Sequence, residues 1–354
     1  PSNPTINDQL GLCGGQGVVL ADVSNDGVSD LVVGAMFAGP NNTGNVHVWF
    51  GGASLVGAVA ATAVLAFQGA LPNDQLGDVS GQGIQVADVT GDGLLDIVVG
   101  ARWCDLPAID TGAIFVWAAG PGLSGAPTPT AILADANAAG GQLCGATIDG
   151  FLLEDVTGDG IRDVVTAAPL RAVGAIGGTG AGYVWAGGGT LTGNVAPRAL
   201  LVSPFAAPAD ALAVCGATPG LQVADVTGDG IQDIVVATAG TDFGALIDCG
   251  SCIVWAGGAT LTGTPAARAS LRMPLLVAFD QMGLSGGNGV LLRDVTGDGV
   301  KDVIVASMFA DVGALADVGT ILVWAGGAGL AGPVLPPLAT LQSPSLQAFD
   351  QLTG

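Results

Sequence analysis

The sequence predicts an all-β fold, a β-propeller of four-stranded blades built from five repeats. Two recurring patterns predict this fold. A nine-residue acidic phrase, DVTGDGLLD at residues 88–96, returns in nearly the same form at 22–30, 155–163, 225–233 and 294–302. A Val-Trp pair keeps the same spacing, with tryptophans at positions 49, 117, 185, 255 and 324. Repeats of this length with four strands are typical of propellers, in which ring closure buries the faces that one blade leaves exposed.

The repeat period is close to seventy residues. The first aspartates of successive phrases lie 66, 67, 70 and 69 residues apart. A third marker, Asp-Gln-Leu-Gly or Asp-Gln-Met-Gly, begins 14 residues before the phrase in three copies, at Asp8, Asp74 and Asp280. Together these markers predict one domain over residues 1–354, with repeats 1 to 5 at about 5–70, 71–137, 138–206, 207–276 and 277–345.

Each repeat contains four short runs that favour β-strands. In repeat 2 these runs are residues 83–88, 95–100, 113–117 and 129–133. They are rich in Val and Ile and are separated by Gly, Pro and Asp, as strands and tight turns require. The runs are apolar on both faces, which is expected of a small sheet that packs between two neighbours.

The charge of the chain limits its partners. It has 30 acidic and 8 basic residues and a formal net charge of −22. Nucleic acids and anionic membrane surfaces both need clustered Lys and Arg, so we expect no nucleic-acid partner. No apolar run approaches the ~18 residues that cross a bilayer, so we also expect no transmembrane segment.

The acidic phrase has the composition of a calcium loop. In D-x-[ST]-x-D-G-x-x-D, side-chain oxygens stand at positions 1, 3, 5 and 9, position 7 can offer a carbonyl, and Gly at position 6 allows a sharp turn. Two carboxylates ~4 Å apart repel by ~4 kcal/mol at an effective dielectric near 20, so such crowding favours a bound cation. The absence of Cys and His from the phrases disfavours soft metals, and Mg²⁺ prefers to keep its waters. The alternative is a plain Asp- and Gly-rich turn.

The sequence therefore predicts about five Ca²⁺ ions, one for each phrase. Five divalent ions would change the formal charge from −22 to −12, since they add 10 charges. The predicted ligands occupy positions 1, 3, 5, 7 and 9 of the five phrases: Asp22, Ser24, Asp26, Val28, Asp30, Asp88, Thr90, Asp92, Leu94, Asp96, Asp155, Thr157, Asp159, Ile161, Asp163, Asp225, Thr227, Asp229, Ile231, Asp233, Asp294, Thr296, Asp298, Val300 and Asp302.

The run over residues 86–101, VADVTGDGLLDIVVGA, resembles an FG-GAP repeat, the unit of the integrin α-subunit propeller and its bacterial relatives. The Phe-Gly element is weakened to Leu76-Gly77 in this repeat, and the Gly-Ala-Pro element is kept in part as Gly100-Ala101. The resemblance implies that each acidic phrase joins the first two strands of a blade and binds Ca²⁺ on one face of the propeller. Integrin propellers have seven blades. Asp350 begins another marker 70 residues after Asp280, so we expect either five closed blades or part of a longer, for example seven-bladed, propeller.

Six cysteines suggest disulfides and an oxidising compartment, because their number is even and we expect them in or beside loops. Cys104 with Cys144 is one possible pair, and Cys215 with Cys249 or Cys252 is another. The connectivity stays open. Cys249-Gly-Ser-Cys252 lacks the βαβ context of a thioredoxin-like site, so we do not expect redox catalysis.

The sequence offers little for catalysis, and we predict that the protein is not an enzyme. His47 is the single histidine, and it takes the place of Phe115 and Tyr183 in the repeat register, which favours a packing role. A glycosidase would need paired carboxylates. Most acids outside the phrases are interpreted as solvated loop residues: Asp105, Asp110, Asp149, Asp242, Asp248, Asp311 and Asp317. Glu154 and Arg293 take a place that is Ala in the other repeats; they could face each other across the ring, but we favour exposed strand ends.

These observations predict a calcium-binding, extracellular or cell-surface adhesion or interaction module. Its expected partner is a protein or glycan ligand on the loop face that carries the cysteines. One alternative is a structural subunit of an extracellular assembly that self-associates. Another is a carbohydrate-binding or carbohydrate-cleaving propeller. The repeated tryptophans would then form a sugar-stacking platform, although their place inside strands favours packing between blades.

Overall fold

The fold was analysed in a computed structural model, which describes residues 8–13, 15, 17–79, 81–142, 144–145, 150–215, 218–285, 289–345, 347–349 and 351. These residues form strands β1 to β24 and contain no helix, so the all-β prediction is confirmed. Asp149 and Asp350 lie outside the described residues. The chain divides into two compact units, residues 1–153, 161–166 and 184–197, and residues 154–160, 167–183 and 198–354.

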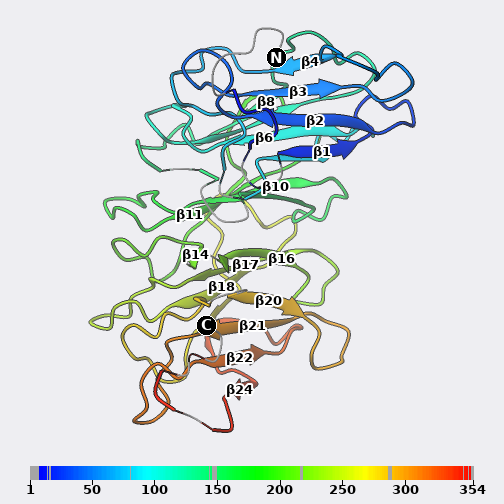
Figure 1. The fold of residues 1–354 in the computed structure, drawn as a ribbon. Helices are drawn as coiled ribbons and strands as arrows, with labels where there is room; N and C mark the ends of the chain where they lie inside the picture. Colours follow the sequence, from blue (N-terminus) through cyan, green and yellow to red (C-terminus); the bar gives the residue numbers. More distant parts are fainter. Residues whose placement is uncertain are drawn as a thin grey trace. The chain divides into compact units, whose positions relative to one another are not determined.

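The first unit contains two complete sheets. One has the order β1-β2-β3-β4 (Figure 1). The other has the order β5-β6-β7-β8, with β12 added in parallel to β8. The four antiparallel strands of each sheet come from one predicted repeat, while β12 comes from repeat 3, and the strands of repeat 2 match the four predicted runs. The strand bounds are β1 (Val18–Ala21), β2 (Asp30–Ala35), β3 (Asn45–Trp49), β4 (Ala63–Leu65), β5 (Ile84–Ala87), β6 (Asp96–Ala101), β7 (Ala113–Trp117), β8 (Ala131–Leu133) and β12 (Gly193–Val195).

The second unit repeats this plan. One sheet has the order β16-β17-β18-β19 with β23 parallel to β19, the other has the order β20-β21-β22-β24, and β14 pairs with β15 in a small hairpin. The strand bounds are β14 (Val214–Cys215), β15 (Thr218–Pro219), β16 (Leu221–Ala224), β17 (Asp233–Thr238), β18 (Ser251–Trp255), β19 (Ala269–Leu271), β20 (Val290–Arg293), β21 (Asp302–Ser307), β22 (Thr320–Trp324), β23 (Gly332–Leu335) and β24 (Ala339–Leu341).

A further four-stranded sheet, of order β13-β11-β10-β9, has its strands divided between the two units. Its strands are β9 (Phe151–Glu154), β10 (Asp163–Ala168), β11 (Ala181–Trp185) and β13 (Ala199–Leu201). The described residues thus form five sheets of four or five strands, in register with the five predicted repeats.

The second strand of each repeat lies at the centre of its core. All six residues of β6 and of β17 are buried, as a strand with two apolar faces requires. Four of the five repeated tryptophans pack in the same cores: Trp117, Trp185, Trp255 and Trp324 are at most 2% exposed, whereas Trp49 is half-buried. A sugar-stacking platform needs open indole faces, so the packing interpretation is confirmed for these four.

His47 also packs in the core. Its ring is 1% exposed and stacks on Trp49 with 5.7 Å between ring centroids. Neither ring nitrogen has a hydrogen-bond partner. Burial lowers the pKa of this imidazole, which therefore stays neutral. The packing role predicted from the repeat register is confirmed.

All six cysteines are buried and none forms a disulfide in the structure, so the predicted disulfides are not shown. Cys252 is the second residue of β18, opposite Ala237, and thus lies beside a loop as the sequence predicted. Cys13 donates a hydrogen bond to the carbonyl of Gly77 at 2.7 Å. Burial raises the pKa of Cys215 to about 12, which keeps its thiol protonated and unreactive.

Candidate metal centre

Each acidic phrase joins the first two strands of its repeat, in the position that the sequence predicted. The phrase of repeat 2 begins directly after β5 and ends on the first residue of β6, where Asp96 pairs with Ala87 across the sheet. The phrase is therefore a tight turn whose last carboxylate belongs to a central strand. Its other oxygens lie in the turn itself.

The position-1 carboxylate organises the turn. In repeat 2, Asp88 accepts the backbone N–H of Gly91 at 2.7 Å and that of Gly93 at 2.9 Å. The corresponding aspartates Asp155, Asp225 and Asp294 accept the equivalent pair of glycine N–H groups. Because both glycines have positive φ, between 73° and 90° in these four phrases, the turn conformation depends on them.

The position-9 carboxylate anchors the phrase to the sheet. Asp30, Asp96, Asp163, Asp233 and Asp302 all have a relative exposure of 0%. In repeat 5, one oxygen of Asp302 accepts the N–H groups of Val295 and Thr296 at 2.8 and 2.9 Å, and the other accepts the N–H of Gly326 at 2.9 Å. A carboxylate oxygen has two acceptor positions, so the second oxygen can still bind another partner.

The position-3 hydroxyl lies beside these carboxylates, but farther away than in a normal hydrogen bond. Thr90 Oγ1 is 3.3 Å from Asp96 Oδ1, and Thr296 Oγ1 is 3.4 Å from Asp302 Oδ1. An O–H···O hydrogen bond is normally about 2.7–2.8 Å long, so these contacts are loose. In repeat 4, the buried hydroxyl of Thr227 makes no hydrogen bond of normal geometry with any described residue.

This spacing fits a calcium ion. Two oxygens that bind one Ca²⁺ at about 2.4 Å and at a right angle lie about 3.4 Å apart, whereas Mg²⁺ would bring them to about 2.9 Å. In repeat 1, Ser24 Oγ lies 3.4 Å from Asp22 Oδ1 and 3.5 Å from Asp30 Oδ1. Positions 1, 3 and 9 of that phrase thus place three oxygens together at calcium-like separations.

Positions 5 and 7 do not join the group of oxygens formed by positions 1, 3 and 9. Asp92 accepts the N–H of Leu94 at 2.8 Å and is exposed, and Asp298 accepts the N–H of Val300 at 2.9 Å. In the described part of the chain, no three acidic, His or Cys side chains gather closely enough to hold a metal ion. The structure thus brings together positions 1, 3 and 9 of the predicted ligand set in repeat 1 and positions 3 and 9 in repeats 2 and 5, while the position-5 carboxylates of Asp92 and Asp298 face their own turns.

The pKa values of the phrase carboxylates depend on their burial and on nearby N–H donors. Burial raises the pKa of Asp96 and of Asp233. Burial acts in the same direction on Asp302, but N–H donors from Gly326, Val295 and Thr296 outweigh it and lower the pKa of that carboxyl. A hard cation would favour the charged form at every phrase.

Sequence reasoning missed a second set of acids, which we call the aspartate-braced loops. The marker aspartate Asp280 is 1% exposed and accepts the N–H of Asp311 at 3.2 Å, while Asp311 accepts the N–H of Asp317 at 3.0 Å. The same relay links Asp74 with Asp105 and Asp110, and Asp210 with Asp242 and Asp248. These acids brace loops, which corrects their interpretation as solvated residues. For two of the three loops the signal was present in the sequence marker, Asp-Gln-Leu-Gly at Asp74 and Asp-Gln-Met-Gly at Asp280.

Two buried aspartates of the braced loops, Asp210 and the marker aspartate Asp280, each have one oxygen without a partner among the described residues, Oδ1 of Asp210 and Oδ2 of Asp280. Burial raises the pKa of both carboxyls to about 6, and the nearby charges of Asp242 and Asp311 act in the same direction. The two sets differ in their hydrogen-bond donors: Asp302 accepts three N–H groups, which lower its pKa, whereas Asp210 and Asp280 each keep an oxygen without a described partner and have a raised pKa.

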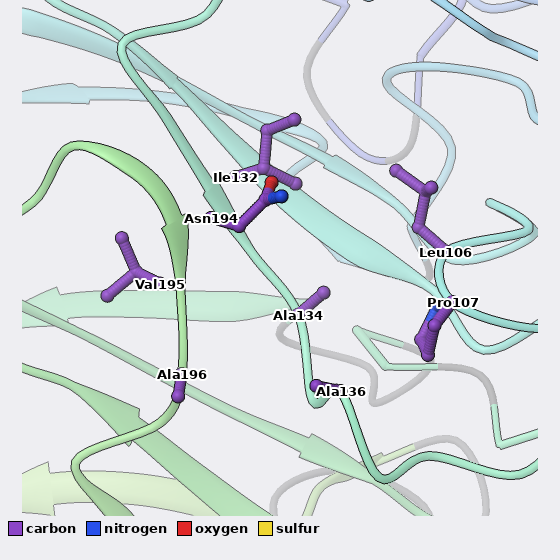
Figure 2. A pocket seen from close by; sticks show the side chains of 8 residues that line it. All are labelled: Leu106, Pro107, Ile132, Ala134, Ala136, Asn194, Val195 and Ala196. Atoms are coloured by element: carbon purple, nitrogen blue, oxygen red, sulfur yellow. The ribbon is translucent and has the colours of Figure 1, made fainter.

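An apolar pocket lies beside β8 and β12, with a volume of about 220 Å³ (Figure 2). Leu106 and Pro107 line one side, and Ile132 and Ala134 line another. Asn194 is the one polar residue of its lining. Since the lining holds no acid, base or nucleophile, this pocket offers no catalytic group.

The repeated sheets and their acidic turns define the chain as a β-repeat protein. A family model described as FG-GAP repeat matches residues 14–49, which include the first acidic phrase and the first tryptophan. This match confirms the resemblance read from the sequence, within that repeat. No curated protein matches the chain. The described residues include no helix with the length and apolar character needed to span a membrane.

Proposed function

We propose that this chain is a calcium-binding, non-catalytic interaction module that acts outside the cell or on its surface. One Ca²⁺ binds at each acidic phrase, held by positions 1, 3 and 9 and completed by positions 5 and 7. The observation that supports this most is the set of 3.3–3.5 Å separations between the position-3 hydroxyls and the neighbouring carboxylates. FG-GAP repeats are typical of extracellular and surface proteins, and the match over residues 14–49 supports that location.

The ion would neutralise carboxylates that otherwise repel each other in the turn. The hydrogen bonds of each phrase determine which part of the fold this neutralisation stabilises. Asp96 connects the turn to β6, and its N–H donors Val89 and Thr90 belong to the turn itself. An occupied phrase therefore fastens the first two strands of a repeat to each other. The exposed loops are then left for a protein or glycan ligand.

A calcium titration with matched variants tests this proposal. The wild-type chain should bind about five Ca²⁺ ions by isothermal titration calorimetry or native mass spectrometry. Thr90→Val removes the position-3 oxygen of one phrase while keeping its shape, so one ion should bind more weakly by about tenfold, which is the loss of one ligand contact of about 1.4 kcal/mol. Thr128→Val makes the same chemical change at an exposed residue outside the phrases and should leave the titration unchanged.

Two results would reject the calcium sites. One is a chain that binds no Ca²⁺ while it remains folded. The other is equal binding of Mg²⁺ and Ca²⁺ with no effect of Thr90→Val. A glycan array then distinguishes a carbohydrate ligand from a protein ligand, and the buried tryptophans favour the protein.

A further inference from the structure

A second pocket, which we call the β19 pocket, differs in its chemistry from the apolar pocket shown in Figure 2. It has a volume of about 610 Å³ and lies where residues 264–268 lead into β19, beside residues 202–205 and the start of β23. All its lining residues belong to the second unit. Pockets that hold small ligands have volumes of about 300–1,000 Å³, so the side chains of its lining indicate a ligand class.

The β19 pocket has a positive charge. Arg268 is the one charged residue among its lining residues, and it is exposed directly before β19. None of the lining residues is acidic, although the chain as a whole has 30 acidic and 8 basic residues. The pocket is therefore complementary to an anionic group, and a guanidinium is suited above all to a carboxylate.

The guanidinium of Arg268 has donors to spare, as a comparison with Arg198 shows. Arg198 takes the same place before β13, and its Nε and Nη2 donate to the carbonyls of Leu261 and Ala259 at 3.1 and 3.2 Å. Among the described residues, Arg268 makes only the second of these bonds, from Nη2 to the carbonyl of Ala328 at 2.9 Å. The N–H groups at Nε and Nη1 of Arg268 are therefore available to a ligand.

Two buried hydroxyls add donors to the same pocket. Ser203 and Ser270 line it and are 6% and 3% exposed. The hydroxyl of Ser203 accepts the N–H of Phe205 at 3.1 Å, so its own O–H can donate to another group. Ser270 is the middle residue of β19, whereas the middle residue of β8 is Ile132, which lines the pocket of Figure 2. The β19 pocket is thus polar where the other pocket is apolar.

Much of the remaining lining is apolar. Three prolines and Phe205 contribute rings to it. The ring of Phe205 packs on that of Phe243 with 4.8 Å between centroids, and the guanidinium of Arg272 lies 5.2 Å from the Phe243 ring. A ligand with an apolar body can bury that body against these rings.

One wall of the β19 pocket lacks a hydrogen bond that the other repeats have. In repeats 1, 2, 3 and 5, the indole N–H of the repeated tryptophan donates to a carbonyl ten or eleven residues later, at 2.9–3.1 Å. The buried indole N–H of Trp255 has no partner among the described residues. The residue ten positions after it is Pro265, which lines the pocket. This wall is therefore held by one bond fewer than its counterparts and can adjust to a ligand.

We propose that the β19 pocket binds an apolar molecule that carries one carboxylate. The guanidinium of Arg268 pairs with the carboxylate, the hydroxyls of Ser203 and Ser270 are further donors, and the prolines and Phe205 cover the apolar part. A small aromatic acid and the C-terminal carboxylate of a peptide share this chemistry. None of the lining residues belongs to an acidic phrase, so the site does not depend on the calcium sites.

Benzoate and benzamide are matched probes, because they differ only in the charged group. In isothermal titration calorimetry with the full chain, benzoate should bind about tenfold tighter than benzamide or better, since hydrogen bonds between charged partners are the stronger ones. Arg268→Gln should weaken benzoate binding by about tenfold or more and leave benzamide binding unchanged. Arg198→Gln makes the same change at the equivalent place of repeat 3, outside the lining, and should leave both titrations unchanged.

A peptide probe distinguishes the two sources of the carboxylate. Acetyl-alanyl-phenylalanine is titrated as the free acid and as the C-terminal amide. A free acid that binds tighter than both its amide and benzoate assigns the pocket to a peptide C-terminus. A free acid that binds no tighter than benzoate assigns it to a small acid.

The indole N–H signals in proton–nitrogen NMR locate the bound probe. The Trp255 signal, identified by its loss in Trp255→Phe, should shift during the benzoate titration, whereas the Trp49 signal should not. The proposal is overturned if neither acid binds at about 10 mM, if benzamide binds as well as benzoate, or if Arg198→Gln weakens binding as much as Arg268→Gln. Shifts of other indole signals without that of Trp255 place the probe elsewhere and also overturn it.

Discussion

The acidic phrases and the aspartate-braced loops use the same residue type for opposite purposes. In the phrase of repeat 5, the carboxylates of Asp294 and Asp302 accept several N–H groups and lie near a hydroxyl. In the braced loop of the same repeat, Asp280 is buried with one oxygen unpartnered. Donors that surround an oxygen stabilise its charge, whereas burial without donors favours its protonated form. Neighbouring backbone groups, and not the number of acids, therefore decide which set suits a cation.

Removing calcium should have the largest effect, and it should act on the phrases alone. At a free concentration of 100 times the dissociation constant, each ion stabilises the fold by about 2.7 kcal/mol. Chelator should therefore lower the thermal midpoint of wild type strongly, as measured by differential scanning calorimetry. Asp280→Asn should show the same loss. A smaller loss in Asp280→Asn would mean that the braced loops also bind the ion.

Asp96→Ala should have the next largest effect, even in chelator. It leaves the N–H groups of Val89 and Thr90 without their buried acceptor, so we expect a loss of about 3–5 kcal/mol in the free energy of unfolding. Denaturant titration measures this loss. Asp92→Ala is the control, since its carboxylate is exposed, and it should cost less than about 1 kcal/mol. Equal losses in the two variants would show that position 9 does not anchor the turn.

The braced loop should make stability fall as the pH rises. The pKa of Asp280 is raised to about 6, so the folded state holds its proton between the ordinary pKa of 3.8 and about 6, while the unfolded state has lost it. Stability should fall across that window and stay level above it. Asp280→Asn should remove this fall and stabilise the chain at pH 7 by up to about 3 kcal/mol. An Asp280→Asn variant whose stability falls with pH as that of wild type does, measured in chelator, would contradict the assignment of the raised pKa to Asp280.

His47→Phe should produce the smallest change, a gain in stability. The substitution replaces a buried imidazole that lacks hydrogen-bond partners with the residue that stands at the same place in repeat 2, Phe115. An unsatisfied buried polar group costs about 1–3 kcal/mol, so we expect a gain of about 1 kcal/mol. Denaturant titration measures it, and Phe115→His is the reverse control, which should destabilise the chain. A loss in His47→Phe would indicate a hydrogen bond that the ring needs.

The sequence predicted the strands well because each is a short apolar run between turn residues. The run 113–117 became β7 without a change of bounds. The predicted placement of the cysteines in or beside loops agrees with the structure, since even Cys252 is only the second residue of β18, but none of the six forms a disulfide. The aspartate-braced loops escaped prediction since their hydrogen bonds join residues about 30 positions apart, as between Asp280 and Asp311.

By itself, the sequence determined the period, the strands and the oxygen-rich turns, because these depend on residue order within a few positions. Only the tertiary structure decided the surroundings of each buried acid. Asp302 accepts three backbone N–H groups, whereas Asp280 keeps one oxygen without a partner among the described residues. Some of these partners lie 24 to 31 positions away, as Gly326 does from Asp302 and Asp311 from Asp280, and local sequence carries no information about such distant neighbours.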